Sequence, residues 1–86
     1  MIGDEVDPTF LKKGDHVYVL VRSSATCRSE GIVFEVKDSK QWKGDWYIKL
    51  RAFKRSSGKI ISNQERRSID FIEDVYRSTA TFYRAV

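Results

Sequence analysis

The stretch that decides the fold reads Trp46-Tyr47-Ile48-Lys49-Leu50-Arg51-Ala52-Phe53. Because side chains alternate between the two faces of a β-strand, one face of this stretch is apolar, with Trp46, Ile48, Leu50 and Ala52. The other face carries two rings and two cations, Tyr47, Lys49, Arg51 and Phe53. The first face predicts a buried core. The second suits nucleic-acid binding, since cations neutralise phosphates and exposed rings stack on bases.

Further strands are expected on both sides of this stretch. Residues 16–22 carry valine at every second position, opposite a mixed face that suits a barrel or a strongly bent sheet. Gly31 opens another strand, whose inward residues are Ile32, Phe34 and Val36. Residues 54–59 predict a hairpin loop, and Ile60-Ile61 a short last strand. Together these elements predict a β-barrel over residues 14–61.

Two segments are expected outside the strands. Residues 1–8 are acidic and end in Asp7-Pro8, which biases Asp7 away from helix, so an extended or frayed lead-in is predicted. Residues 38–45 are predicted to be a loop connection, because the Gly44-Asp45 pair is a turn signal just before the central strand.

The C-terminal segment, residues 62–86, differs in kind. Ser62 and Glu65 have the spacing of a capping box, and helical spacing continues through Ile69, Ile72, Val75, Tyr76, Thr79 and Tyr83. A helix is therefore predicted from about residue 63 to residue 76, with a possible extension beyond it. The alternative is a fifth strand over residues 68–72, since Ile69 and Phe71 also alternate.

The composition describes a single folded domain of 86 residues, with 41% hydrophobic and 33% charged residues. Cys27 is the only cysteine, so no internal disulfide points to an oxidising compartment. The acidic start differs from a signal peptide, and no apolar run approaches the roughly 20 residues of a membrane span. The sequence predicts a cytoplasmic protein that is a monomer or small homo-oligomer and has no membrane partner.

The positive charge is concentrated in the middle of the chain. Residues 1–36 hold four cations and six carboxylates, a net charge of −2. Residues 37–67 hold ten cations and three carboxylates, a net charge of +7. Residues 68–86 return to −1, with two cations and three carboxylates. This distribution is typical of a protein that binds a polyanion.

The chain offers little for catalysis. His16 is the only histidine and Cys27 the only cysteine, so neither a zinc ligand set nor an oriented nucleophile and base can be assembled from them. The carboxylates Asp70, Glu73 and Asp74 are most simply a solvated helix face. The sequence predicts a protein that is not an enzyme and uses no cofactor or metal.

Three stretches carry a resemblance to a known family, Gly14-Asp15-His16-Val17-Tyr18-Val19, Glu30-Gly31-Ile32-Val33-Phe34-Glu35-Val36 and Trp46-Tyr47-Ile48-Lys49-Leu50. Over about half of the chain they resemble the small SH3-like barrels of the KOW and Tudor-like type. The resemblance implies a partly open barrel that acts as a binding module for RNA, DNA or a protein tail. With the predicted C-terminal α-helix, the expected fold is mainly β.

The expected function is non-catalytic binding of RNA or DNA. In this hypothesis Trp42 and Tyr47 stack on bases or sugars while cations of the middle third hold phosphates. The predicted site consists of Lys40, Trp42, Lys43, Tyr47, Lys49, Arg51, Lys54, Arg55 and Lys59.

Two alternatives remain open at this point. A protein-interaction or regulatory module would dock on an acidic partner through the same surface, or on another chain through the apolar C-terminal segment. A Tudor-like aromatic cage for a cationic side chain would use Trp42, Trp46, Tyr47 and Tyr18.

Overall fold

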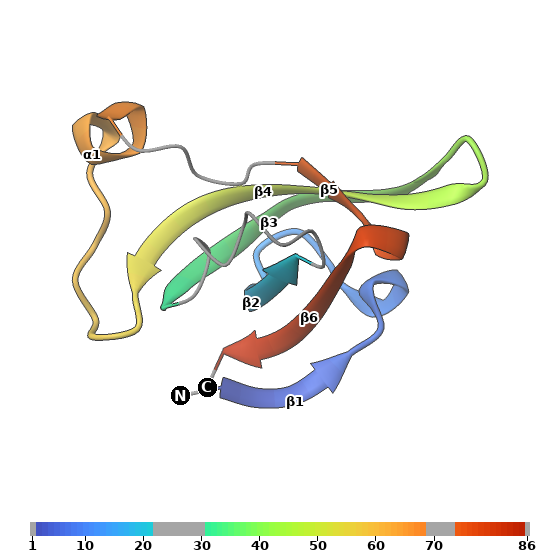
Figure 1. Ribbon diagram of the computed structural model, residues 1–86, viewed down its shortest axis with the longest axis horizontal. Coiled ribbons are helices and arrows are strands. Elements are labelled where there is room, and N and C mark those ends of the chain that lie inside the picture. The colour runs from blue at the N-terminus through green and yellow to red at the C-terminus, as the bar shows by residue number, and fades with distance from the viewer. Residues whose placement is uncertain (1, 22–30, 69–73, 86) are drawn as a thin grey trace.

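A computed structural model of the chain describes residues 2–21, 31–68 and 74–85 (Figure 1). Six antiparallel strands form one sheet, in the order β1-β6-β2-β3-β4-β5. Their bounds are β1 Ile2–Val6, β2 His16–Val21, β3 Ile32–Trp42, β4 Asp45–Arg55, β5 Asp74–Tyr76 and β6 Ala80–Ala85. Within the described residues the edge strands β1 and β5 do not pair with each other, so the sheet is open. The mainly β prediction is confirmed.

The alternation predicted for the central strand is confirmed in β4. Ile48, Leu50 and Ala52 are at most 2% exposed and belong to the main apolar core, and Trp46 is half-buried against it. Tyr47 and Phe53 on the opposite face are half-buried, and Lys49 and Arg51 are exposed. The core also draws on β2, β3, β5 and β6, and Leu11 and Ile61 extend it beyond the strands.

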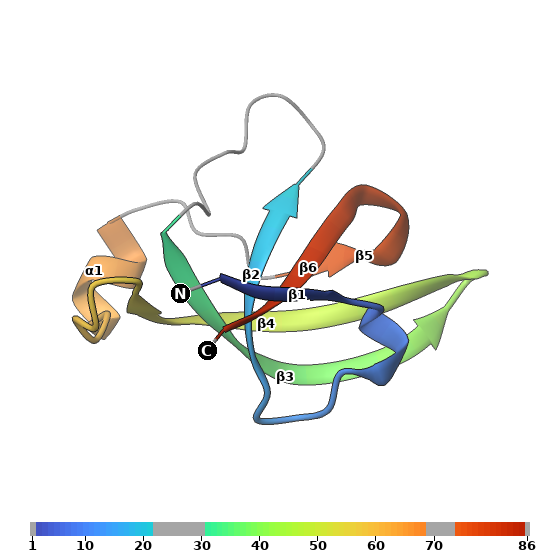
Figure 2. The same ribbon diagram turned by 90° about the horizontal axis from the view of Figure 1, so that it is seen from below.

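The segment 38–45 is not a loop, contrary to the sequence prediction. β3 continues to Trp42 and β4 begins at Asp45, leaving Lys43 and Gly44 as a two-residue turn. Both turn residues have positive φ, 48° and 81°, as tight hairpin turns that match the strand twist require. Figures 1 and 2 both show this hairpin extending as an arm beyond the other strands.

The predicted C-terminal helix is confirmed over residues 63–68 and wrong from residue 74 onward. α1 spans Asn63–Ser68 and starts with the expected cap, since the Glu65 backbone N–H donates to the Ser62 hydroxyl at 3.1 Å. From residue 74 the chain forms β5, the 3-10 turn η3 (Arg77–Thr79) and β6. Residues 69–73 are outside the described residues. They include Ile69, Ile72 and all but the first residue of the alternative strand at 68–72.

Strand pairing explains why the helical spacing misled. Val75 lies opposite Ile48 of β4, and Phe82 lies between Val6 of β1 and Val19 of β2. In β6 the side chains of Ala80 and Phe82 are buried while the intervening Thr81 is half-buried, which is the period of a strand. Burial of these residues between neighbouring strands outweighs the local preference for helix.

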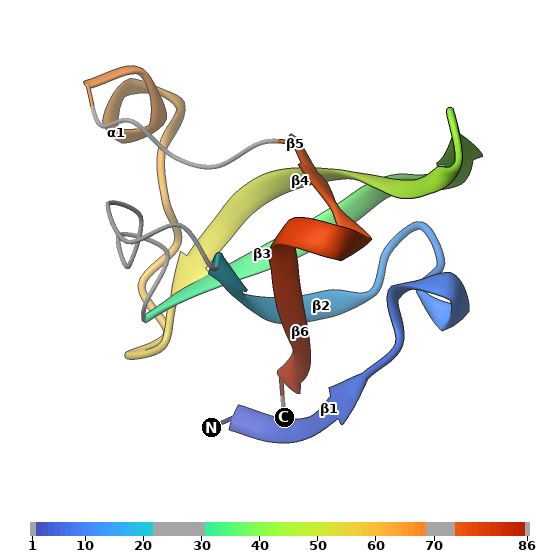
Figure 3. The same cartoon turned by 45° about the vertical axis from the view of Figure 1, so that its right-hand side comes forward.

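Residues 2–6 are extended, which is one of the two predicted alternatives, and they form a strand rather than a frayed lead-in. β1 pairs with β6 through Glu5 opposite Tyr83 and Val6 opposite Phe82. The 3-10 turn η1 (Pro8–Phe10) follows and is capped by the Asp7 carboxylate, which accepts from the Thr9 backbone N–H at 3.0 Å. Figures 1 and 3 show both ends of the chain side by side at this edge of the sheet.

Candidate functional site

Side chains on the outward face of β3, β4 and β5 lie in rows across the sheet, because paired residues of neighbouring strands are side by side. One row consists of Lys40, Tyr47 and Tyr76. The next row, two residues along each strand, consists of Asp38, Lys49 and Asp74. Trp42 lies on the same face of β3, nearer the hairpin turn. The strand pairing therefore brings together three rings from three strands.

These rings surround a depression that we call the aromatic hollow, lined by Lys40, Trp42, Tyr47 and Tyr76 and about 300 Å³ in volume. The Tyr47 and Tyr76 rings meet edge to face, with centroids 5.7 Å apart. The Lys40 ammonium lies 5.6 Å from the Trp42 ring centroid and 5.9 Å from that of Tyr47. Trp42 is 47% exposed and Tyr76 38%, so large aromatic side chains remain open to solvent.

A hydrogen bond fixes the middle ring of the hollow. The Tyr47 hydroxyl donates to the Asp74 carboxylate at 2.6 Å. This bond, with burial and the nearby Asp74 charge, raises the pKa of Tyr47 to about 12. Tyr47 is therefore neutral at physiological pH, and its hydroxyl already has an acceptor.

A second depression adjoins the aromatic hollow, and we call it the basic groove. It has a volume of about 650 Å³ and is lined by Lys13, Lys37, Asp38, Lys49, Leu50, Arg51 and Arg66. Five of these residues are cations and one is a carboxylate. The two depressions are neighbours because Asp38 and Lys49 belong to the row next to that of Lys40 and Tyr47.

The cations of the basic groove differ in what already holds them. Arg66 is structural: its guanidinium donates to the backbone carbonyls of Ala52 and Ile61, each at 3.0 Å, and so ties α1 to β4. Lys37 lies 3.5 Å from the Glu35 carboxylate. Within residues 2–21, 31–68 and 74–85, the charges of Lys13, Lys49 and Arg51 form no ion pair, although the Arg51 guanidinium donates to the Asn63 amide oxygen at 3.2 Å. Because Asn63 is neutral, this hydrogen bond leaves the positive charge of Arg51 without a counter-charge.

The predicted site residues fall into two groups. Six of them line or border the two depressions: Lys40, Trp42, Lys43, Tyr47, Lys49 and Arg51. Lys43 belongs here because its ammonium lies 5.6 Å from the Trp42 ring centroid. The other three do not line either depression: Lys54 and Arg55 are the last two residues of β4, and Lys59 lies in the segment between β4 and α1.

Arg55 and Lys54 of the second group already have partners in the fold. The Arg55 guanidinium pairs with the Glu65 carboxylate at 2.7 Å, and that hydrogen bond lowers the pKa of Glu65. The Lys54 ammonium lies 5.9 Å from the ring of Phe53, which stacks on His16 at 4.8 Å. Lys59 is exposed, and its carbonyl accepts from the Arg55 backbone N–H in a tight turn.

No family model, curated protein or solved structure matches the chain.

Sequence reasoning missed several residues of the two depressions. The sequence prediction places Tyr76 and Asp74 in a helix, and the predicted site does not include Lys13, Lys37 or Arg66. The alternation of Asp74, Val75 and Tyr76 was the available signal, but three residues are too few to predict a strand. Only the pairing with β4 shows that Tyr76 faces Tyr47.

The four-ring cage considered from the sequence does not assemble. Trp46 and Tyr47 point to opposite faces of β4, and the Trp46 indole N–H donates to the Ser39 hydroxyl at 2.6 Å. Tyr18 is buried in β2, at 6% exposure. The rings that do converge are those of Trp42, Tyr47 and Tyr76.

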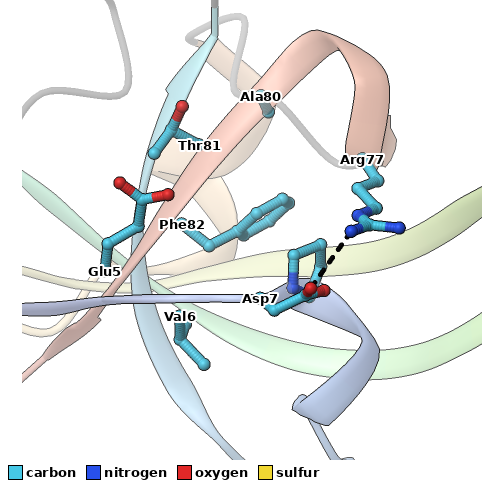
Figure 4. A pocket seen from close by; sticks show the side chains of 8 residues that line it. Glu5, Val6, Asp7, Arg77, Ala80, Thr81 and Phe82 are labelled. Carbon is cyan, nitrogen blue, oxygen red and sulfur yellow. Dashed lines mark hydrogen bonds and ion pairs between the residues drawn. The ribbon is translucent and has the colours of Figure 1, made fainter.

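A third depression lies between β1, η3 and β6, and it has the opposite character. It is about 480 Å³ in volume and is lined by Glu5, Val6, Asp7, Pro8, Arg77, Ala80, Thr81 and Phe82 (Figure 4). Its cation, Arg77, already pairs with Asp7 at 3.1 Å. The Thr9 backbone and hydroxyl hydrogen bonds, together with Arg77, lower the pKa of Asp7. With two carboxylates and one paired guanidinium, this depression is unsuited to an anion.

The described part of the chain contains no cluster of three His, Cys, Asp or Glu side chains that could hold a metal ion. None of the helices described there is long and apolar enough to cross a bilayer.

Proposed function

We propose that this protein is a non-catalytic module that binds nucleic acid through the outward face of β3, β4 and β5. One observation carries the proposal, namely that exposed rings and unpaired cations occupy adjoining depressions on a single face. A polyanion without bases would need only the cations. A ligand that offers both phosphates and flat rings matches the two depressions together.

The cations give the proposal its phosphate contacts. Lys13 and Arg51 lie in the basic groove, and Lys40 and Lys43 lie at the hairpin end of the same face. Such contacts are largely independent of base sequence and weaken as salt rises, because binding releases counterions from the nucleic acid.

The fold supports the proposed relationship to SH3-like barrels. Strands β2, β3, β4 and β5 follow one another as an antiparallel meander, and β6 returns to pair with β2. A partly open SH3-like barrel of the KOW or Tudor-like type would have such a meander and returning strand. Cytoplasmic location is part of the same proposal, since a chain with one cysteine cannot form the internal disulfide that an oxidising compartment would allow.

Fluorescence anisotropy with labelled single-stranded DNA, duplex DNA and RNA of equal length tests the proposal. The informative variant replaces both Lys49 and Arg51 by glutamate, because both side chains are exposed and lie in the basic groove. Lys12→Glu is the matched control, since Lys12 is exposed and next to Lys13 but does not line the groove. Circular dichroism of each variant checks that the sheet is retained.

We expect the double variant to lose most of its affinity and Lys12→Glu to keep nearly all of it. Absence of binding to all three nucleic acids at low salt would overturn the proposal. The alternative, an acidic protein docked on the same cations, would then be the better explanation, since it requires the basic groove but not the aromatic hollow.

A further inference from the structure

We propose that the ligand is single-stranded and that one of its bases, turned out of the stack, occupies the aromatic hollow. This inference rests on the proposed function and specifies the form of the nucleic acid. The three rings of the hollow come from three strands, which gives a surface that a base can contact over its flat face. In a duplex that face is covered by the neighbouring base pairs, and exposing it costs unstacking and unpairing energy, so an unpaired strand presents it far more readily.

The size and openness of the hollow fit this ligand. Its volume, about 300 Å³, is at the lower end of the range for small-ligand pockets. Trp42 and Tyr76 are both more than one third exposed, so a base reaches them without any movement of the sheet. Since the Tyr47 hydroxyl is held by Asp74, this ring offers a fixed surface rather than a free donor for the base edge.

Lys40 has a particular role in this arrangement. Its ammonium lies over the Trp42 and Tyr47 rings, where a base would stack. Binding therefore requires the ammonium to leave the rings, and the same flexible side chain then reaches the phosphate of the incoming nucleotide. Lys40 thus exchanges a cation–π contact for a phosphate contact, which limits the cost of opening the hollow.

The charges around the hollow indicate where the sugar–phosphate backbone of the nucleic acid runs. The row of side chains next to the hollow, on the side of the basic groove, has Lys49 at its centre. Asp38 lies on one side of Lys49 and Asp74 on the other. Two carboxylates beside one ammonium repel a phosphate at this level. We therefore place the phosphates on either side of that row, near Lys40 and Lys43 at the hairpin end and near Arg51 and Lys13 in the groove.

The test compares Trp42→Ala and Tyr76→Ala with Phe10→Ala. Phe10 is a matched control because it is an exposed ring, at 70%, on η1 and outside the hollow. Each protein is titrated with single-stranded DNA, single-stranded RNA and duplex DNA of equal length. Trp42→Phe, which keeps a ring at this position, should restore most of the binding lost in Trp42→Ala.

We expect each hollow variant to weaken binding of both single strands by roughly 5- to 150-fold, the range for removal of a base–ring stack. The affinity for duplex DNA, which we expect to be lower than that for single strands, should change little in the hollow variants. Phe10→Ala should bind like the unaltered protein. In a Trp46→Phe background the remaining indole is Trp42. Its fluorescence should be quenched by single strands and not by duplex.

Two results would overturn this inference while leaving the proposed function intact. One is duplex binding as tight as single-strand binding. The other is unchanged single-strand affinity in both hollow variants, while glutamate at positions 49 and 51 still abolishes binding. Absence of binding to every nucleic acid would instead remove the proposed function itself.

Discussion

The salt dependence of binding can be worked out from the charges of the site. Five cations border the two depressions without an ion pair in the described part of the chain, Lys13, Lys40, Lys43, Lys49 and Arg51. Arg66 and Lys37 are excluded, because the first is held by backbone carbonyls and the second by Glu35. Lys49 is excluded from the five, because it lies between the carboxylates of Asp38 and Asp74. For a single strand, each neutralised phosphate contributes about −0.7 to the slope of log K against log salt concentration.

The remaining four contacts therefore give a slope of about −2.8. Between about 50 and about 200 mM salt the association constant should fall on the order of 50-fold. Neutralising one of the four, as in Arg51→Gln, should reduce the slope to about −2.1, because one phosphate contact is lost. Lys12 lies outside the groove, so Lys12→Gln should leave the slope at its original value.

The assay is anisotropy with a labelled single strand at four or more salt concentrations. A slope close to zero would refute the reasoning, since binding would then not involve these charges. Equal slopes for the unaltered protein and Arg51→Gln would also refute it, because the groove would make no contact with phosphate. A change in slope with Lys12→Gln alone would place the site on another face.

The remaining predictions concern the supporting structure. Ile48→Ala removes a side chain with no exposure and should lower the free energy of unfolding by about 2–5 kcal/mol in urea titrations; an unchanged midpoint would contradict the assigned strand faces. Tyr47 should titrate near pH 12 by phenolate absorbance, and Asp74→Asn should move the midpoint toward 10. Since folding favours the neutral phenol, its stabilising contribution is present below about pH 10 and is lost as pH rises to 12. Arg66→Ala should accelerate amide exchange in α1, because the guanidinium bonds to the Ala52 and Ile61 carbonyls are lost; unchanged exchange would show that α1 does not depend on them.

The elements that local patterns specify were predictable from the sequence. The alternation in β4 predicted which residues are buried, because residues two positions apart in a strand, such as Ile48 and Leu50, lie on the same face. The Ser62 and Glu65 pair likewise predicted where α1 starts. Both features depend only on residues a few positions apart.

The elements that depend on distant partners were not predictable. The hairpin arm has polar residues on both strands, so nothing in its hydrophobicity distinguishes it from a loop until its pairing is known. Val75 and Phe82 have helical spacing, but they are buried by contacts with strands far away in sequence. The aromatic hollow escaped prediction for the same reason, because Tyr76 reaches Tyr47 across 29 positions of the chain.

The position of β6 in the sheet has a consequence for biosynthesis. β6 is the last of the six strands to leave the ribosome, yet it is the neighbour through which β1, the first strand, joins the sheet. Until residues 80–85 emerge, β1 lacks the strand with which it pairs in the folded protein, and Val17 and Val19 of β2 lack the cover of Phe82. The nascent chain therefore acquires its native sheet only after translation of this segment, and a ribosome stalled a few codons earlier would hold an incomplete fold.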